Sequence, residues 1–225
     1  SVLTEQLPYM SLTTKKVTKE VATLSEHIKK QLDYIQGHFL FDTYVSAYGD
    51  GDWDDTLQPA DPAQKQTMAS TWTEELTIET MRKCQKVFTD DKELKDITTS
   101  LAKNMMADFT KYFEQDSVLP GFIRMNDRHE VTPLIHPSDD ITGIDYRLLP
   151  LSQGVLSRIL TGNQADNALS LIKAHLLFPD GVRLMDKPST YHGGTSIIFK
   201  RAEQAANFGR EIGLLYVHAH IRYAE

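Results

Sequence analysis

The apolar residues in the first third of the chain recur every three or four positions, which is the spacing of amphipathic helices. The first stripe predicts a helix that ends near Gly37, and it consists of Val17, Val21, Leu24, Ile28, Leu32 and Ile35. A second helix is predicted to begin at Asp61 and Pro62, an N-cap and a first-turn proline, and to run toward Val87. Its stripe includes Met68, Trp72 and Leu76.

A third stripe predicts a helix that ends before Pro120 and Gly121. This stripe contains Leu94, Ile97, Leu101, Met105, Phe109 and Phe113. The pattern becomes irregular over residues 121–149, where two short apolar runs predict strands at 122–125 and 131–135. We expect this part of the chain to form a small β excursion between helices.

Helical spacing resumes at about 150–161 and 163–177, and a last helix is predicted over about 197–225. Between them, residues 177–195 form a long loop rich in proline and glycine. Long helices joined by long, polar loops are typical of a mainly α protein, a helical barrel or bundle with its site at one end.

Composition excludes several classes of function. The formal net charge of −7 argues against nucleic acid or an anionic membrane as the main partner. No apolar run approaches the ~20 residues that cross a bilayer, and the single cysteine, Cys84, cannot form an intrachain disulfide. We therefore expect a cytoplasmic location. The chain starts at Ser1 and stops at Glu225 inside a helix-like run, so we expect it to be a piece of a longer polypeptide.

Residues 48–59 carry the most informative chemistry, because four aspartates fall within six positions around Trp53. Carboxylates this close repel one another, and a lone carboxylate resists burial. The run is therefore a solvated turn, a cation site, or part of a site that uses a perturbed carboxyl group. A solvated turn leaves Trp53 unexplained, since a large apolar side chain gains from burial.

A calcium loop accounts for the run only in part. Asp50, Asp52 and Asp54 occupy positions 1, 3 and 5 of the EF-hand pattern. Asp55 stands where that loop needs glycine, and Pro59 interrupts it, so we expect no metal here. A sugar site uses the whole run: an indole ring offers a flat face to a pyranose, and crowded carboxylates raise one another's pKa toward that of a general acid.

The last predicted helix is apolar nearly all round, which indicates burial. Glu211 and His218 are seven residues apart, so a continuous helix would place them on one face, as a core network or as part of a site. His218 and His220 would point to different sides, which argues against a His-x-His metal site. Before the helix, residues 192–195 supply glycines, a hydroxyl and backbone N–H groups that can hold an anion.

Together these motifs resemble the inverting sugar phosphorylases of glycoside hydrolase family 94. Gly-Asp-Trp-Asp-Asp at 51–55 resembles the family's Gly-Asp-Trp-Asn-Asp signature. Arg-Glu at 210–211 and Tyr-Val-His-Ala at 216–219 resemble its Lys-Glu pair and Tyr-Thr-His-Ala segment, with the same spacing. The opening Leu-Thr-Glu-Gln-Leu-Pro-Tyr at 3–9 is similar to its Leu-Asp-Glu-x-Val-Pro-Phe stretch. The longer sequence stretches that contain these motifs are most similar to the branch that acts on β-1,2-linked oligoglucans.

The resemblance implies that residues 1–225 are a single fragment of a larger (α/α)6 barrel catalytic domain. It implies that Asp55 is the general acid and that Trp53 and Asp52 belong to the sugar site. Glu211 matches a sugar-binding glutamate, and Arg210 stands in place of the family's lysine. The aspartate at position 54 replaces the asparagine of the signature, which adds a charge beside the proposed acid.

The same resemblance implies phosphate binding by His218, and the anion-holding motif adds His192 and Thr195. The reaction implied is phosphorolysis of a β-glucosidic bond with inversion, which makes the protein a glycosyltransferase that gives α-glucose 1-phosphate and needs no cofactor beyond inorganic phosphate as co-substrate. The implied partners are a β-glucan oligosaccharide, phosphate and the remainder of the polypeptide. An inverting hydrolase on the same barrel, with Glu211 as its base, and a non-catalytic carbohydrate-binding helical domain are the alternatives.

Overall fold

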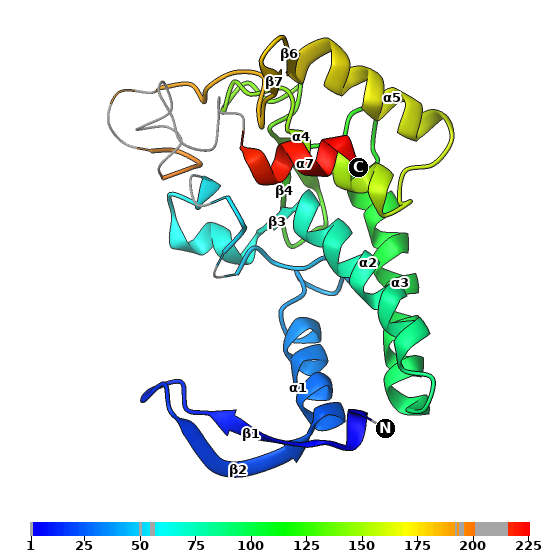
Figure 1. Cartoon of the computed structure of the whole chain (residues 1–225). Helices are drawn as coiled ribbons and strands as arrows, with labels where there is room; N and C mark the ends of the chain where they lie inside the picture. Colours follow the sequence, from blue (N-terminus) through cyan, green and yellow to red (C-terminus); the bar gives the residue numbers. More distant parts are fainter. Residues whose placement is uncertain (1, 50, 55–56, 192, 194–195, 201–215) are drawn as a thin grey trace.

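The computed structural model describes residues 2–49, 51–54, 57–191, 193, 196–200 and 216–225 (Figure 1). This part of the chain is mainly helical, as predicted. It opens with an arm made of the short 3₁₀ helix η1, an antiparallel hairpin and one helix; the hairpin lies at the bottom of Figure 1, and Ser25 and Lys29 of the helix bond to Asp91 and Glu93. The elements of the arm are η1 (Val2–Thr4), β1 (Gln6–Met10), β2 (Val17–Thr23) and α1 (Leu24–Gln36).

The start of α1 corrects the first predicted helix. Val17 and Val21 lie in β2, where Val21 pairs with Pro8 of β1, and the helix begins only at Leu24. Thr23 and Glu26 form a capping box: Thr23 Oγ1 accepts from the Glu26 N–H at 3.2 Å, and Glu26 Oε2 accepts from the Thr23 N–H at 2.7 Å. This box sets the helix start, and the β-branched residues before it suit a strand.

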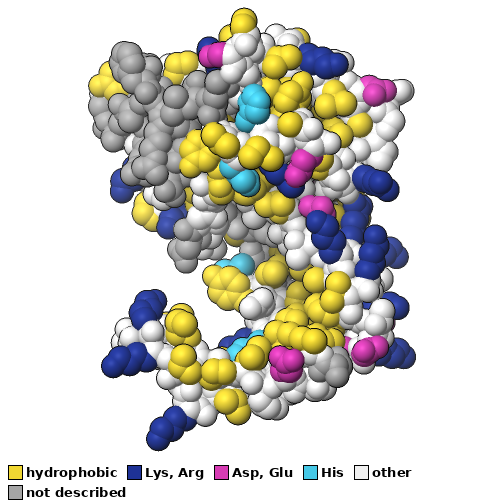
Figure 2. All heavy atoms as spheres, in the orientation of Figure 1, with side chains coloured by type: hydrophobic (Ala, Val, Ile, Leu, Met, Phe, Trp, Pro, Cys, Tyr) yellow, Lys and Arg dark blue, Asp and Glu magenta, His cyan; other side chains and the backbone are white. Residues whose placement is uncertain are grey.

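Hydrophobic side chains gather along the arm, at the bottom of Figure 2. More than a third of each of these side chains is exposed: Val2, Leu7, Met10, Leu12, Val17 and Val21. An apolar surface of this kind on a hairpin is a common mark of a contact with another segment.

The second predicted helix divides into three elements. Asp61 is an N-cap, as predicted, with its carboxylate accepting from the Ala63 N–H at 2.9 Å, but it begins only the 3₁₀ helix η3 (Pro62–Gln66). The chain then extends as β3 (Met68–Ser70), and α2 covers Thr71–Val87. Met68 is thus in a strand, because β3 pairs with a distant partner that local spacing does not reveal.

That partner is the predicted β excursion, which is confirmed as β4 (Phe122–Met125) and β5 (Val131–Leu134). The three strands form an antiparallel sheet in the order β3-β4-β5, with Ala69 opposite Ile123 and Ile123 opposite Pro133. Ile123 is fully buried at the centre of this sheet, so the sheet belongs to the core.

The remaining helices pack on α2 and on one another: α3 and α4 contact α2, and α5 and α7 contact α4. The third predicted helix is confirmed as α3, which Asp91 caps. The helices predicted at about 150–161 and 163–177 are shorter than expected. The first, α4, ends at Leu156, and the second, α5, is followed by a π-helical turn. Core side chains of α2, α3 and α4 include Ile78, Met105 and Leu149. The bounds are α3 (Lys92–Tyr112), α4 (Leu148–Leu156), α5 (Asn163–Leu171), η4 (Ile172–Leu176), β6 (Leu177–Phe178), β7 (Gly181–Val182) and α7 (Val217–Ala224).

The last predicted helix is confirmed over Val217–Ala224, the residues of α7, and is wrong at its start. Residues 197–200 are not helical, and Phe199 forms an isolated bridge with Pro59. Tyr216 is extended (φ −78°, ψ 113°) and precedes α7, so no continuous helix joins Glu211 to His218. The seven-residue spacing therefore does not place these two residues on one helical face. No helix in the described part of the chain is long and apolar enough to cross a bilayer.

Two adjacent glutamates of α2 are fully buried, Glu74 and Glu75. Burial raises the pKa of Glu74 to about 8, although the Ser46 N–H, 3.0 Å from Oε2, acts in the opposite direction. Burial also raises the pKa of Glu75 well above its usual value, despite the opposing charge of Arg147. Burial therefore favours the protonated form of both carboxyl groups, and a pKa of about 8 leaves most of Glu74 protonated at neutral pH.

The Glu74 carboxyl should make the stability of the chain depend on pH. Because its pKa is about 8 when folded and near 4.5 when unfolded, its contribution is greatest below pH 4.5 and declines as pH rises toward 8. Glu74→Gln should remove up to about 1.4 kcal/mol per pH unit from that slope in urea unfolding between pH 5 and 8. Glu20→Gln, at an exposed position of β2, should keep the wild-type slope; an unchanged slope in Glu74→Gln would contradict the assignment.

Candidate active site

The carboxylate of Asp52 is the centre of the acidic loop, and its side chain is completely buried. Asp52 Oδ1 accepts from Arg147 Nη2 at 3.1 Å and from the Asp54 N–H at 2.9 Å, while Thr73 Oγ1 lies 3.4 Å from Oδ2. Burial by itself would raise the pKa of Asp52. The charge of Arg147 and the hydrogen bonds from Ser70, Asp54 and Arg147 outweigh it and hold the pKa below its usual value.

Arg147 lies at the N-cap of α4 and is the residue that sequence analysis missed. Its side chain is fully buried. Nη1 lies 3.4 Å from the Gly121 carbonyl oxygen and 3.5 Å from Ser70 Oγ, and the guanidinium carbon lies 4.7 Å from the centroid of the Phe122 ring. Arg147 directly precedes the apolar run 148–151 at the start of a helix, but only the fold shows its partner.

The Trp53 ring is half-buried and connects the acidic loop to α7. Its centroid lies 4.9 Å from that of Tyr216, edge to face, and 5.3 Å from that of His218. Trp72 of α2 lies on another side, at 6.0 Å. The structure therefore brings Trp53 and His218 together, although 164 positions separate them in the sequence.

The two histidines of α7 point to different sides, as predicted. His218 faces Trp53 and is exposed, whereas Nδ1 of His220 accepts from the Val182 N–H of β7 at 3.4 Å. A His-x-His arrangement around one ligand is therefore not formed.

The acidic loop also pairs with the segment that follows the predicted anion-holding motif. The Ala60 N–H donates to the Ile198 carbonyl oxygen at 2.8 Å, and the Lys200 N–H donates to the Gln58 carbonyl oxygen at 2.8 Å. These long-range bonds hold 58–60 against 198–200. Five sequence-predicted site residues lie outside the described residues: Asp55, His192, Thr195, Arg210 and Glu211.

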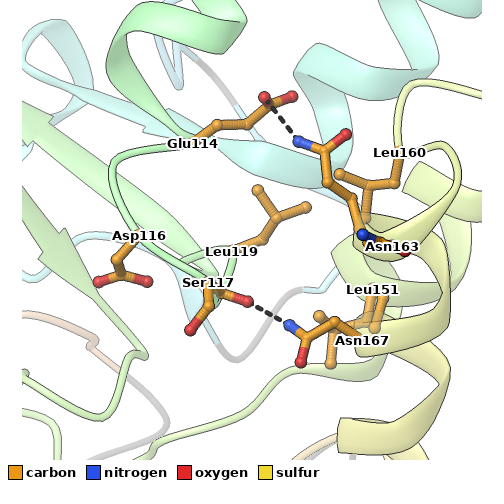
Figure 3. A pocket seen from close by; sticks show the side chains of 10 residues that line it. Glu114, Asp116, Ser117, Leu119, Leu151, Leu160, Asn163 and Asn167 are labelled. Carbon is orange, nitrogen blue, oxygen red and sulfur yellow. Dashed lines mark hydrogen bonds between the residues drawn. The ribbon is translucent and has the colours of Figure 1, made fainter.

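A cavity of about 190 Å³ lies elsewhere, between the turn after α3 and α5 (Figure 3). Its polar side chains serve the packing of α5, because Gln164 Nε2 donates to Glu114 Oε2 at 3.1 Å and Asn167 Nδ2 donates to the Ser117 carbonyl oxygen at 2.5 Å. No lining residue comes from the acidic loop or α7. The loop around Trp53, and not this cavity, is therefore the candidate site.

Comparison with solved structures gives weak likenesses to saccharide-degrading enzymes. An unsaturated glucuronyl hydrolase from Bacillus sp. GL1 matches with a TM-score of 0.43 and 11% identity, over 78% of this chain and 46% of that one. A UGL variant with dGlcA-Glc-Rha-Glc has the same TM-score and identity, over 72% and 43%. No family model matches the chain. Likeness at this level fixes neither fold nor activity.

Sequence comparison is more specific. The chain is 47% identical over all 225 residues to a 1,2-β-oligoglucan phosphorylase of Listeria innocua serovar 6a. It spans 20% of the length of that protein. The similarity to a 1,2-β-oligoglucan phosphorylase that the motifs indicate is thereby confirmed, and it extends along the whole chain.

Trp53 should hold α7 in place. Trp53→Ala removes the ring contacts with Tyr216 and His218, and an aromatic pair contributes about 0.5–1.5 kcal/mol beyond area burial. We expect faster amide hydrogen exchange in Val217–Ala224, measured by mass spectrometry at neutral pH. Tyr34→Ala removes a comparable ring contact on the arm, 3.9 Å from His38, and should leave α7 unchanged. Equal exchange of α7 in wild type and Trp53→Ala would contradict this arrangement.

Proposed function

We propose that this chain is part of the catalytic domain of an inverting phosphorylase that cleaves β-glucosidic bonds with phosphate. Its substrates are β-1,2-glucooligosaccharides and its product is α-glucose 1-phosphate. The observation that carries the proposal is the 47% identity, along the entire chain, to a 1,2-β-oligoglucan phosphorylase. Because the chain spans 20% of that relative, the activity belongs to the natural polypeptide that carries these residues.

The geometry around Trp53 supports a sugar subsite beside an anion site. A half-buried indole can stack on the C–H face of a pyranose, and its neighbour His218 is exposed and able to donate to an oxyanion. Residues 198–200 pair with the acidic loop, and we assign phosphate binding to His192 and Thr195, which precede them in the sequence. Glu211 and Arg210 complete the proposed sugar contacts.

In the proposed reaction, phosphate attacks the anomeric carbon from the face opposite the leaving oxygen. The new C–O bond forms to phosphate while the glycosidic C–O bond breaks, and Asp55 transfers its proton to the departing oxygen. Phosphate is already an anion, so no general base is needed. His218 offsets the repulsion between phosphate and the aspartates of the loop.

The fold is proposed to be one part of an (α/α)6 barrel, with residues 1–225 as a single piece of it. The exposed apolar side chains of the arm support a contact with the remainder of the polypeptide, because an apolar surface of this kind gains from being covered (Figure 2). The proposed site lies where the acidic loop meets α7, so other segments of the barrel would supply its remaining walls.

Phosphate dependence tests the reaction class. The natural polypeptide that carries this chain should release α-glucose 1-phosphate from β-1,2-glucooligosaccharides only when phosphate is present. Anion-exchange chromatography of the products measures this release. Release of glucose at the same rate without phosphate would instead establish a hydrolase and reject the phosphorylase. Binding of oligosaccharide with no product under either condition would establish a carbohydrate-binding domain.

Asp55→Asn tests the general acid. The substitution removes the transferred proton while keeping the size of the side chain, and a general acid contributes about 10²–10⁴-fold to the rate. We expect kcat to fall by that factor and oligosaccharide affinity, measured by calorimetry, to stay within about threefold, or ~0.65 kcal/mol. Asp61→Asn, at the exposed cap of η3, is the matched control and should keep wild-type kcat. Equal loss of kcat and of affinity in Asp55→Asn would contradict the role.

A further inference from the structure

The guanidinium group of Arg147 is buried against two carboxylates of the acidic loop. Nη2 lies 3.1 Å from Asp52 Oδ1 and 4.0 Å from Asp54 Oδ2, and all three side chains are inaccessible to solvent. Removing a charge from water is costly unless partners satisfy it. Here Asp52, the Gly121 carbonyl and Ser70 accept from the two terminal nitrogens, and the Phe122 ring lies against the guanidinium.

One oxygen atom connects this ion pair to the candidate sugar platform. Asp52 Oδ1 accepts both from Arg147 Nη2 and from the backbone N–H of Asp54, so it closes a tight turn whose middle residue is Trp53. The second oxygen, Oδ2, lies 3.4 Å from Thr73 Oγ1 of α2, and the preceding residue of that helix, Trp72, contacts the Trp53 ring. The turn is therefore attached to α2 and to the N-terminus of α4 through one carboxylate.

We propose that Arg147 is a positioning residue that presents Trp53 to the oligosaccharide by fixing the carboxylate of Asp52. Arg147 itself does not touch the ligand, because it is fully buried beneath the loop. The inference rests on the proposed function, in which Trp53 lines the sugar site. It assigns a role in substrate affinity to a residue that no motif of the sequence singles out.

A lysine at position 147 keeps the positive charge. It lacks the planar guanidinium group, whose two terminal nitrogens donate to Asp52 and to the Gly121 carbonyl oxygen at the same time. We expect Arg147→Lys, in the natural polypeptide that carries this chain, to raise the KM for the oligosaccharide about tenfold, equivalent to ~1.4 kcal/mol. The KM for phosphate should stay within about twofold, or ~0.4 kcal/mol. Arg183→Lys is the control, since Arg183 also lies over a ring, Phe178, and near a carboxylate, yet outside the loop.

A double-mutant cycle separates positioning from a general effect on folding. If Arg147 acts through Trp53, adding Arg147→Lys to Trp53→Ala should not raise the oligosaccharide KM further. Multiplication of the two separate increases, or a wild-type KM in Arg147→Lys, would overturn the proposal. Should Arg147→Lys fail to fold, as judged by circular dichroism, Asp52→Asn takes its place in the same cycle, since it weakens the ion pair at constant shape.

The same measurements test the positioning role of Arg147 separately from the proposed phosphorylase activity. The oligosaccharide KM can be determined whether bond cleavage requires phosphate or water, so a hydrolytic result would reject the phosphorylase and still test Arg147. Conversely, phosphate-dependent cleavage with a wild-type KM in Arg147→Lys would reject the positioning role alone.

Discussion

The buried ion pair between Arg147 and Asp52 is the interaction on which the candidate site depends. It joins residues 95 positions apart in the chain and fixes the acidic loop to the start of α4. A buried pair of this kind contributes little net stability compared with apolar residues of the same volume, because desolvation offsets the attraction. Breaking it by removing one partner costs about 3–5 kcal/mol, since a charge is left buried. Its value to the protein is therefore geometric: it permits one arrangement of the loop and penalises the others.

This constraint explains how clustered carboxylates are tolerated near the core. Buried carboxyl groups in this part of the chain differ in whether they keep their charge. Asp52 keeps its charge, because Arg147 and hydrogen bonds overcome the effect of burial on its pKa. In the described part of the chain, Glu74 and Glu75 form no such ion pair, and burial raises the pKa of both, which favours their protonated forms. Burial and the nearest cation, and not residue type, thus decide which carboxyl groups carry charge.

The sequence predicts the elements formed by local spacing and misses those that depend on distant partners. The third helix and the strands at 122–125 and 131–134 are confirmed, since their apolar patterns are long or bounded by turn residues. β3 has only three residues, and helical spacing through Met68 hides it, because its reason for being extended is β4. The last predicted helix is confirmed only over 217–224 for a related reason: an apolar run does not show that Tyr216 is extended.

The candidate site shows the same division. The motif residues Trp53 and His218 could be named from the sequence, and their contact follows from the fold. Arg147 could not be named, because no spacing links it to Asp52. Three contacts hold the loop. The buried ion pair fixes Asp52, and backbone hydrogen bonds join 58–60 to 198–200. The rings of Tyr216 and His218 contact Trp53. These three attachments come from three separate parts of the chain. A change in any of them should reach Trp53, so the position of its ring depends on the packing of the whole chain more than on the motif in which it lies.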